Sequence, residues 1–167
     1  MMRLITALLL VLSTTSTAAR ADFNDGVVAL TMGNYDQALE TLMPLANTAN
    51  HAYAQYFLGR MYAAGQGVEQ DPAEAAKWYQ KAAEQGVAEA QFRLGGLYQH
   101  GDGVPQDMEY AYAWYSVATH LGHAKATGAF AESKDQLTAE EFAEAQKLSQ
   151  DLINRYGHVP KTTSRMD

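Results

Sequence analysis

The chain has 167 residues, a length that suits one compact domain with a substantial core. It is 47% hydrophobic and only 19% charged, a composition that excludes an intrinsically disordered protein. Nineteen acidic residues against twelve Lys and Arg give a net charge of −7, which disfavours a surface for nucleic acid or anionic membranes. The absence of cysteine excludes disulfides, thiolate metal sites and cysteine nucleophiles.

Residues 1–21 have the pattern of a secretory signal peptide. A short positive start precedes an uncharged run from Leu4 to Leu12, and small residues at positions 19 and 21 suit a cleavage site. This run would rise only about 14 Å as a helix, too short for the ~30 Å core of a bilayer, so no stable membrane span is predicted. No Asn-x-Ser/Thr sequon is present, which favours a bacterial envelope. We expect an exported protein, periplasmic or secreted, with an uncleaved interfacial anchor as the alternative.

Residues 22–50 are expected to form the first pair of helices. The segment GNYDQA, residues 33–38, resembles the turn between the two helices of a tetratricopeptide repeat. It predicts helices at about residues 23–32 and 36–48. We therefore expect an N-terminal tetratricopeptide-like unit.

Residues 51–122 contain two copies of one 36-residue unit. The first copy, residues 51–86, reads HAYAQYFLGRMYAAGQGVEQDPAEAAKWYQKAAEQG, and the second, residues 87–122, reads VAEAQFRLGGLYQHGDGVPQDMEYAYAWYSVATHLG. They align without a gap and share glycines, aromatics and an acidic position. The shared pairs include Leu58/Leu94, Gly59/Gly95, Tyr62/Tyr98, Gly65/Gly101, Gly67/Gly103, Asp71/Asp107, Trp78/Trp114, Tyr79/Tyr115 and Gly86/Gly122. Such a period indicates a repeat architecture.

Each copy is expected to hold two helices around a glycine turn. Apolar residues recur every three or four positions over residues 52–64, which predicts an amphipathic helix. Gly65 and Gly67 suit the positive φ angles of a helix end and turn. Asp71 can cap the next helix, and Pro72 suits the first position of that helix. This second helix is expected to end near Gly86. We expect Gly59 and other small residues to let neighbouring helices approach, while the tryptophans fill the core.

The pattern A-x-A-x-x-x-L-G-x-x-Y-x-x-G-x-G-V-x-x-D, followed by A-x-x-W-Y and A-x-x-x-G, closely resembles the Sel1-like repeat, a relative of the tetratricopeptide repeat. The resemblance covers residues 52–122 almost completely. It implies an all-α fold, a right-handed α-α superhelix of the tetratricopeptide and Sel1-like solenoid type. About three helix pairs plus a C-terminal capping helix are expected.

Residues 123–156 are predicted to be a degenerate repeat and a capping helix. The pattern restarts in phase at residue 123, but Phe130 and Ala131 replace the Leu-Gly pair. Thr138 and Glu141 have the spacing of a capping box for a last helix with one apolar face. Terminal repeats need such a cap. Residues 157–167 lack periodicity and are expected to form a flexible tail.

No motif in the chain carries recognisable chemistry. The glycine turns lack the preceding strand and the Gly-Lys-Ser/Thr ending of a phosphate loop. His120 and His123 share a spacing but flank Gly122 at a helix end, so we interpret them as isolated surface histidines and not as a zinc site. Neither a nucleophile elbow nor a His-Glu-x-x-His pair occurs. We predict no catalytic activity, no metal and no cofactor.

The candidate binding residues lie on the first helix of each copy. Tyr62, Trp78, Tyr98 and Trp114 repeat with the apolar stripe and are interpreted as core. Residues off the stripe are, by resemblance to tetratricopeptide repeats, expected to line a concave groove. The predicted ligand-binding set is Tyr53, Tyr56, Arg60, Glu89, Phe92, Gln99 and His100, with Ala64 and Gly96 at equivalent offsets. The alternative is a solvated face with incidental tyrosines.

The resemblance implies an adaptor, since proteins of this family commonly assemble complexes in the cell envelope. We therefore predict a non-catalytic, exported scaffold that binds a protein or peptide partner and no nucleic acid. A preformed surface on stacked helix pairs lowers the ordering cost of binding. The alternatives are an enzyme or a glycan-binding module that acts on peptidoglycan-type envelope material.

Overall fold

The structure is a computed structural model that describes residues 22–160, and every regular element in this part of the chain is a helix. The all-α prediction is confirmed. The expected signal peptide, residues 1–21, and the last seven residues, 161–167, lie outside the described residues. After helical residues 22–31 come α2 (Tyr35–Asn47), α3 (Ala52–Ala64), α4 (Pro72–Glu84), α5 (Ala88–His100), α6 (Met108–His120), α7 (Ala124–Lys134) and α8 (Ala139–Tyr156).

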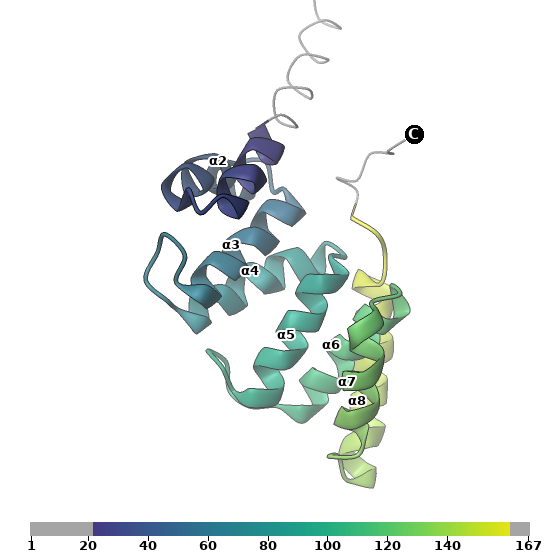
Figure 1. Ribbon diagram of the computed structural model, residues 1–167. Coiled ribbons are helices and arrows are strands. Elements are labelled where there is room, and N and C mark those ends of the chain that lie inside the picture. The colour runs from purple at the N-terminus through teal and green to yellow at the C-terminus, as the bar shows by residue number, and fades with distance from the viewer. Residues whose placement is uncertain (1–21, 161–167) are drawn as a thin grey trace, which may run out of the picture.

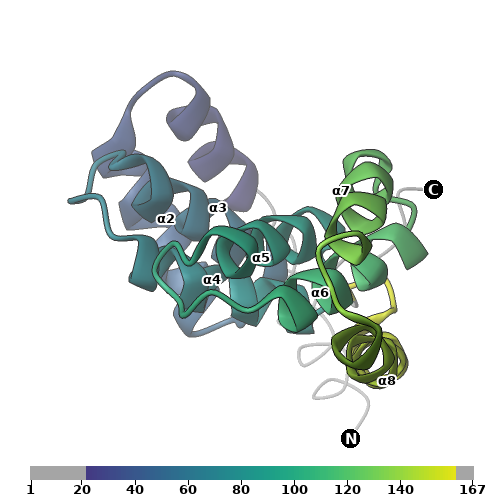
Figure 2. The ribbon, with the colours of Figure 1, turned by 90° about the horizontal axis from the view of Figure 1, so that it is seen from below.

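The helices stack as pairs in chain order, from the purple N-terminal end to the yellow C-terminal end (Figure 1). Helix α3 packs on α4, α4 on α5, and α5 on α6, so each second helix joins two repeats. Figure 2 shows the same succession seen from below. The arrangement is a helical solenoid, as predicted.

The end of the array departs from this pairing. Helix α8 packs mainly against α6 and reaches α4, whereas α7 also packs against α6. In the two repeats, a glycine on the first helix makes room for a tyrosine of the second helix, but Ala131 occupies that position in α7. The last two helices both pack on α6 and do not repeat the glycine–tyrosine contact of the two copies.

The turns confirm the roles expected for glycine and aspartate. Gly65 and Gly101 end α3 and α5 with φ angles of 66° and 73°, which L side chains rarely adopt. The Asp71 carboxylate accepts hydrogen bonds from the amides of Ala73 and Glu74, and the Asp107 carboxylate caps α6 by accepting one from the amide of Tyr110. These caps satisfy amides that would otherwise lack a partner at the helix start.

Gly59 and Gly95 permit the close approach of neighbouring helices. A Cβ atom at Gly59 would lie 2.6 Å from the ring of Tyr79, and one at Gly95 would lie 2.7 Å from the ring of Tyr115. The sequence indicated that small residues here admit a neighbour. The structure shows that each glycine receives the tyrosine of the second helix in its own repeat.

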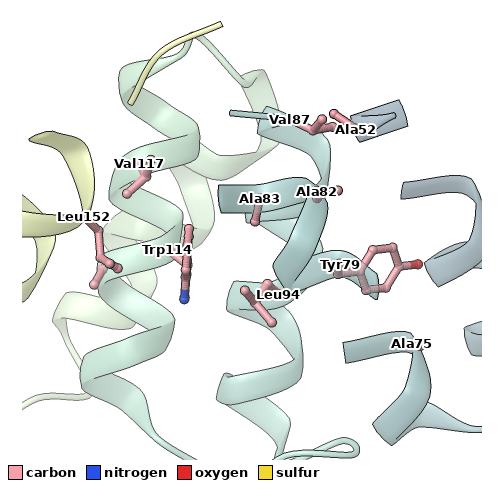
Figure 3. Packing of buried hydrophobic residues seen from close by; sticks show 12 residues of the cluster. Ala52, Ala75, Tyr79, Ala82, Ala83, Val87, Leu94, Trp114, Val117 and Leu152 are labelled. Atoms are coloured by element: carbon pink, nitrogen blue, oxygen red, sulfur yellow. The ribbon is translucent and has the colours of Figure 1, made fainter. Parts of the chain in front are cut away.

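The hydrophobic core runs along the stack in two clusters. Trp78 is 5% exposed and packs with the N-terminal unit, whereas Trp114 is 4% exposed and packs between the second repeat and α8. Figure 3 shows Leu152 of the yellow C-terminal helix beside Trp114 and Val117 of α6. The prediction of core tryptophans is confirmed, while Tyr62 and Tyr98 are only half-buried against these clusters.

The C-terminal capping box forms as expected, and residues 157–160, the first part of the expected tail, pack against the repeats. Thr138 and Glu141 form the predicted capping box of α8. After α8, the carbonyl group of His158 lies against Gly86 and Pro160 is buried. A glycine is needed at residue 86 because its φ angle is 88° and a Cβ atom there would meet this carbonyl group. The segment therefore lies across the junction of the two repeats.

Candidate functional site on helices α3 and α5

The predicted binding residues all lie on α3 and α5, the first helices of the two repeats. Arg60 and His100 are exposed and the others are partly exposed. Glu89, Gln99 and His100 are already bonded inside the protein, whereas Arg60 contacts Tyr56 and has no carboxylate partner among the described residues.

On α3, Arg60 lies over two aromatic rings. Its guanidinium carbon is 6.0 Å from the centre of the Tyr56 ring and 5.6 Å from that of Phe57, which are cation–π distances. These residues share one helix face because they are three or four positions apart. Among the described residues, no carboxylate pairs with Arg60, and the Tyr56 side chain is its polar neighbour.

Tyr79 of α4 lies between the faces of α3 and α5. Its ring centre is 6.1 Å from that of Tyr56, and burial raises its pKa to about 12 against the opposing charges of Arg93 and Arg60. Burial, with a contribution from Glu89, also raises the pKa of Tyr56. Charged groups of both α3 and α5 thus affect the pKa values of these two tyrosines, so Tyr79 lies within electrostatic range of both helices. Arg60, Tyr56 and Phe57 of α3, together with Phe92 and Arg93 of α5, are called the arginine–aromatic surface below.

On α5, Glu89 is occupied by two internal partners. Its carboxylate pairs with Arg93 at 2.9 Å and with His123 Nε2 at 2.6 Å. Partial burial opposes its ionisation, but the hydrogen bond from His123 and the charge of Arg93 lower the pKa of Glu89 overall. This carboxylate therefore orders the junction between α5 and α7 and is less available to a ligand.

His123 is not an isolated surface histidine, and that interpretation is corrected. Its side chain is 13% exposed, and its ring stacks on Phe92 with 4.7 Å between the ring centres. Nδ1 accepts a hydrogen bond from the amide of Ala126 as the N-cap of α7. Because Nδ1 accepts, Nε2 carries the proton and donates it to Glu89. Tertiary contacts that spacing alone does not reveal give this histidine its role.

Gln99 and His100 also have internal partners. Gln99 Oε1 accepts a hydrogen bond from the hydroxyl of Tyr115 at 2.7 Å. His100 Nδ1 lies 2.8 Å from the carbonyl oxygen of Gly96, to which it donates. Tyr53 packs against the core cluster that joins the two repeats and α8. Within the predicted set, Tyr56 and Arg60 thus contact each other and have neither a carboxylate nor a backbone partner among the described hydrogen bonds and ion pairs.

The sequence reasoning missed Phe57, Arg93 and His123. Phe57 and Arg93 occupy the same repeat position, each four residues after a predicted site residue, and this spacing places them on the same helix face. That periodicity was a usable signal. The position of His123 before α7 signalled a possible N-cap, but its contacts with Phe92 and Glu89 depend on the stacking of repeats.

Within residues 22–160, no group of three His, Asp or Glu side chains is arranged to hold a metal ion. In the same part of the chain, no helix has the length and apolar character needed to cross a bilayer. The polar and aromatic groups on the faces of α3 and α5 include tyrosine and phenylalanine rings, guanidinium groups and ion pairs.

The Sel1 repeat family matches residues 52–87 and 88–123, one residue later than the two expected units. The chain is a Sel1-repeat protein. Sel1 repeats generally serve as scaffolds for protein–protein interaction. No match was found among curated proteins.

Two solved structures illustrate the likeness of this Sel1-repeat protein to others. A protective antigen present in uropathogenic Escherichia coli strains, with an SLR fold, is 32% identical at a TM-score of 0.75, over 83% of this chain. A Sel1 repeat protein from Oxalobacter formigenes is 30% identical at a TM-score of 0.62, over 78% of this chain. The present chain spans only 30% and 55% of those two chains, respectively.

Proposed function

We propose that this Sel1-repeat protein is a non-catalytic adaptor of the cell envelope that binds a protein or peptide partner on the arginine–aromatic surface. The single observation that carries the proposal is Arg60, exposed and without a carboxylate partner, held over the rings of Tyr56 and Phe57. Arginine and tyrosine are enriched where interfaces gain most of their binding energy.

The packing of the repeats does not require this surface. Arg60 is replaced by Gly96 and Phe57 by Arg93 in the second repeat, although the two helices pack in the same way. Side chains that the fold leaves free to vary are open to selection for binding. This reasoning supports a partner-binding role for the α3 side of the surface in particular.

The test compares partner capture by the protein and two variants after crosslinking in cells that express it. Tyr56→Ala with Arg60→Ala removes the centre of the surface, and we expect capture of specific partners to fall about tenfold or more. Lys77→Ala with Gln80→Ala on the exposed side of α4 is the matched control, since it also removes one positive charge. Both variants are expected to melt within a few degrees of the parent.

Two results would contradict the proposal. If the α3 double variant retained every partner while the α4 control lost them, the binding face would be on the second helices. Turnover of peptidoglycan-type substrates by the purified protein, abolished by a substitution on the described helices, would instead establish an enzyme.

Export is proposed from the signal-like pattern of residues 1–21. N-terminal sequencing of the protein from a periplasmic or secreted fraction is expected to begin at Asp22 or within a few residues. A functional cytoplasmic pool with Met1 intact would reverse the proposed location and leave the binding surface unaffected.

A further inference from the structure

We infer that the partner segment on the arginine–aromatic surface is acidic: Arg60 binds a side-chain carboxylate whose neighbour in the peptide is aromatic or aliphatic. The inference rests on the proposed function, because it specifies the chemistry of the partner at that surface. It follows from how the cations of the described chain are distributed and from what lies beneath Arg60.

The other described arginines already have carboxylate partners. Arg93 pairs with Glu89 at 2.9 Å and Arg155 pairs with Asp151 at 3.0 Å, each four residues along its own helix. Within residues 22–160, Arg60 is the arginine that lacks such a partner. No acidic residue lies three or four positions from it on α3, so its own helix cannot neutralise it.

The rings beneath Arg60 restrict its guanidinium group and add apolar surface beside it. Tyr56 and Phe57 lie at 6.0 and 5.6 Å from the guanidinium carbon, and their own ring centres are 5.2 Å apart. A guanidinium group held in this way offers its planar fork to a carboxylate at a lower entropic cost. The neighbouring rings favour an apolar side chain next to that carboxylate.

The negative net charge of the chain favours binding of an acidic segment at Arg60 over binding elsewhere on the protein. With a net charge of −7, the protein repels an acidic segment over most of its surface, whereas Arg60 and Arg93 flank the tyrosines here. Arg93 is largely neutralised by Glu89, and Gly96 stands where a second Arg60 would be. We therefore expect one dominant carboxylate contact, located on the first repeat.

The carboxylate is assigned to a side chain within a continuing peptide and not to a chain terminus. Ala64, the next residue along this face of α3, is exposed and small, so it leaves the path beyond Arg60 open.

The test is a selection from random peptides displayed between two carrier segments, so that no peptide has a free carboxyl end. The bait is the whole chain, compared with Arg60→Gln and with Lys77→Gln. Lys77→Gln is the matched control because it also removes one charge, from an exposed lysine of α4 that is 68% accessible. We expect the parent and the control to enrich Asp or Glu beside aromatic or aliphatic residues, and Arg60→Gln to lose this enrichment.

Selected peptides are then measured individually in solution. Replacing the selected Asp or Glu by Asn or Gln is expected to weaken binding to the parent about tenfold or more and to change binding to Arg60→Gln little. This double-mutant comparison isolates the carboxylate–Arg60 contact. Because Arg60 is exposed, circular dichroism of Arg60→Gln should match that of the parent.

The outcomes separate the inference from the proposed function. Peptides that lack acidic residues but depend on Tyr56 and Phe57 would overturn the acidic segment and leave the adaptor proposal standing. Acidic enrichment only in a second library with free carboxyl ends would overturn the side-chain assignment in favour of a chain terminus. Acidic peptides that bind Arg60→Gln as well as the parent would overturn the role of Arg60. No enrichment above background would overturn the proposed function together with the inference.

Discussion

Helices α3 and α5 occupy the same place in successive repeats, yet they present different chemistry. In both, a glycine receives the tyrosine of the second helix, at Gly59 with Tyr79 and at Gly95 with Tyr115. Outside this contact, α3 carries the exposed Arg60 over aromatic rings. On the corresponding face of α5, Glu89 forms ion pairs with Arg93 and His123. The comparison shows that the repeat dictates the packing positions and leaves the faces free to diverge.

The two repeats also differ in the hydrogen bonds of an equivalent buried glutamine. Gln55 and Gln91 are equivalent, and each donates to a carbonyl group of the preceding helix. Gln55 Oε1 accepts a hydrogen bond from Gln85, but Leu121 occupies the equivalent position in the second repeat. There Gln91 Nε2 donates to the carbonyl of Tyr156 at the end of α8. The second repeat therefore depends on the C-terminal helix for a contact that the first repeat does not use.

The largest expected effects lie in what the two repeats share. Trp78→Ala and Trp114→Ala each remove a buried ring, and each is expected to lower the free energy of unfolding by ~3–5 kcal/mol. Thermal or denaturant unfolding measures both. If only one of the pair mattered, the equivalence of the two packing positions would be wrong.

Filling the glycine contacts is expected to cost less. Gly59→Ala and Gly95→Ala each place a Cβ atom within 2.7 Å of a tyrosine ring, so the ring must shift, at about 1–3 kcal/mol. Gly128→Ala on α7 is the matched control, because its Cβ atom would meet nothing within 4 Å. There the better helix propensity of alanine is expected to stabilise the protein slightly. Equal losses at all three glycines in denaturant unfolding would show that the ring contact is unimportant.

The first helices of the two repeats have different N-caps, so we expect their stability to depend differently on pH. His51 caps α3 through Nδ1, which accepts from the amide of Ala54, whereas Val87 stands before α5. Burial lowers the pKa of His51, so the unfolded chain binds the proton more readily and stability falls as pH drops through about 6.5. Below the folded pKa, Nδ1 is protonated and loses a cap that is typically worth ~1 kcal/mol.

His51→Asn tests this cap, since asparagine also caps a helix but does not titrate in this range. Between about pH 7.5 and about pH 5, the melting temperature is expected to fall less for the variant than for the parent. An unchanged loss would assign the pH dependence to other groups.

The smallest expected effect is at Arg60 itself. Arg60→Gln is expected to change the free energy of unfolding by less than ~0.5 kcal/mol, because the side chain is exposed and has no ion pair in the described structure. Glu89→Gln is expected to cost more, up to about 1 kcal/mol, because it weakens the pairs with Arg93 and His123. Chemical denaturation measures both free energies of unfolding. A larger loss of stability for Arg60→Gln than for Glu89→Gln would show that Arg60 has a structural role.

The fold was largely predictable because its signals are local. The capping residues Asp71 and Thr138 and the left-handed Gly65 mark helix boundaries that depend on neighbouring residues alone. The site was less predictable. Tyr56 and Arg60 were selected as candidates because they lie off the core stripe, but the internal bonding of Glu89 and Gln99 was not foreseen because their partners His123 and Tyr115 lie outside α5.

The repeat, its helix boundaries and its core positions thus follow from local sequence signals, because a 36-residue period imposes the same helix signals twice. Which surface groups have internal partners depends instead on how the helices stack. His123 reaches Glu89 across 34 residues, and the segment from His158 to Pro160 lies against Gly86. The cause is that stacking brings together side chains from different repeats, and the partner that satisfies or neutralises a group is set by that proximity and not by its sequence neighbours.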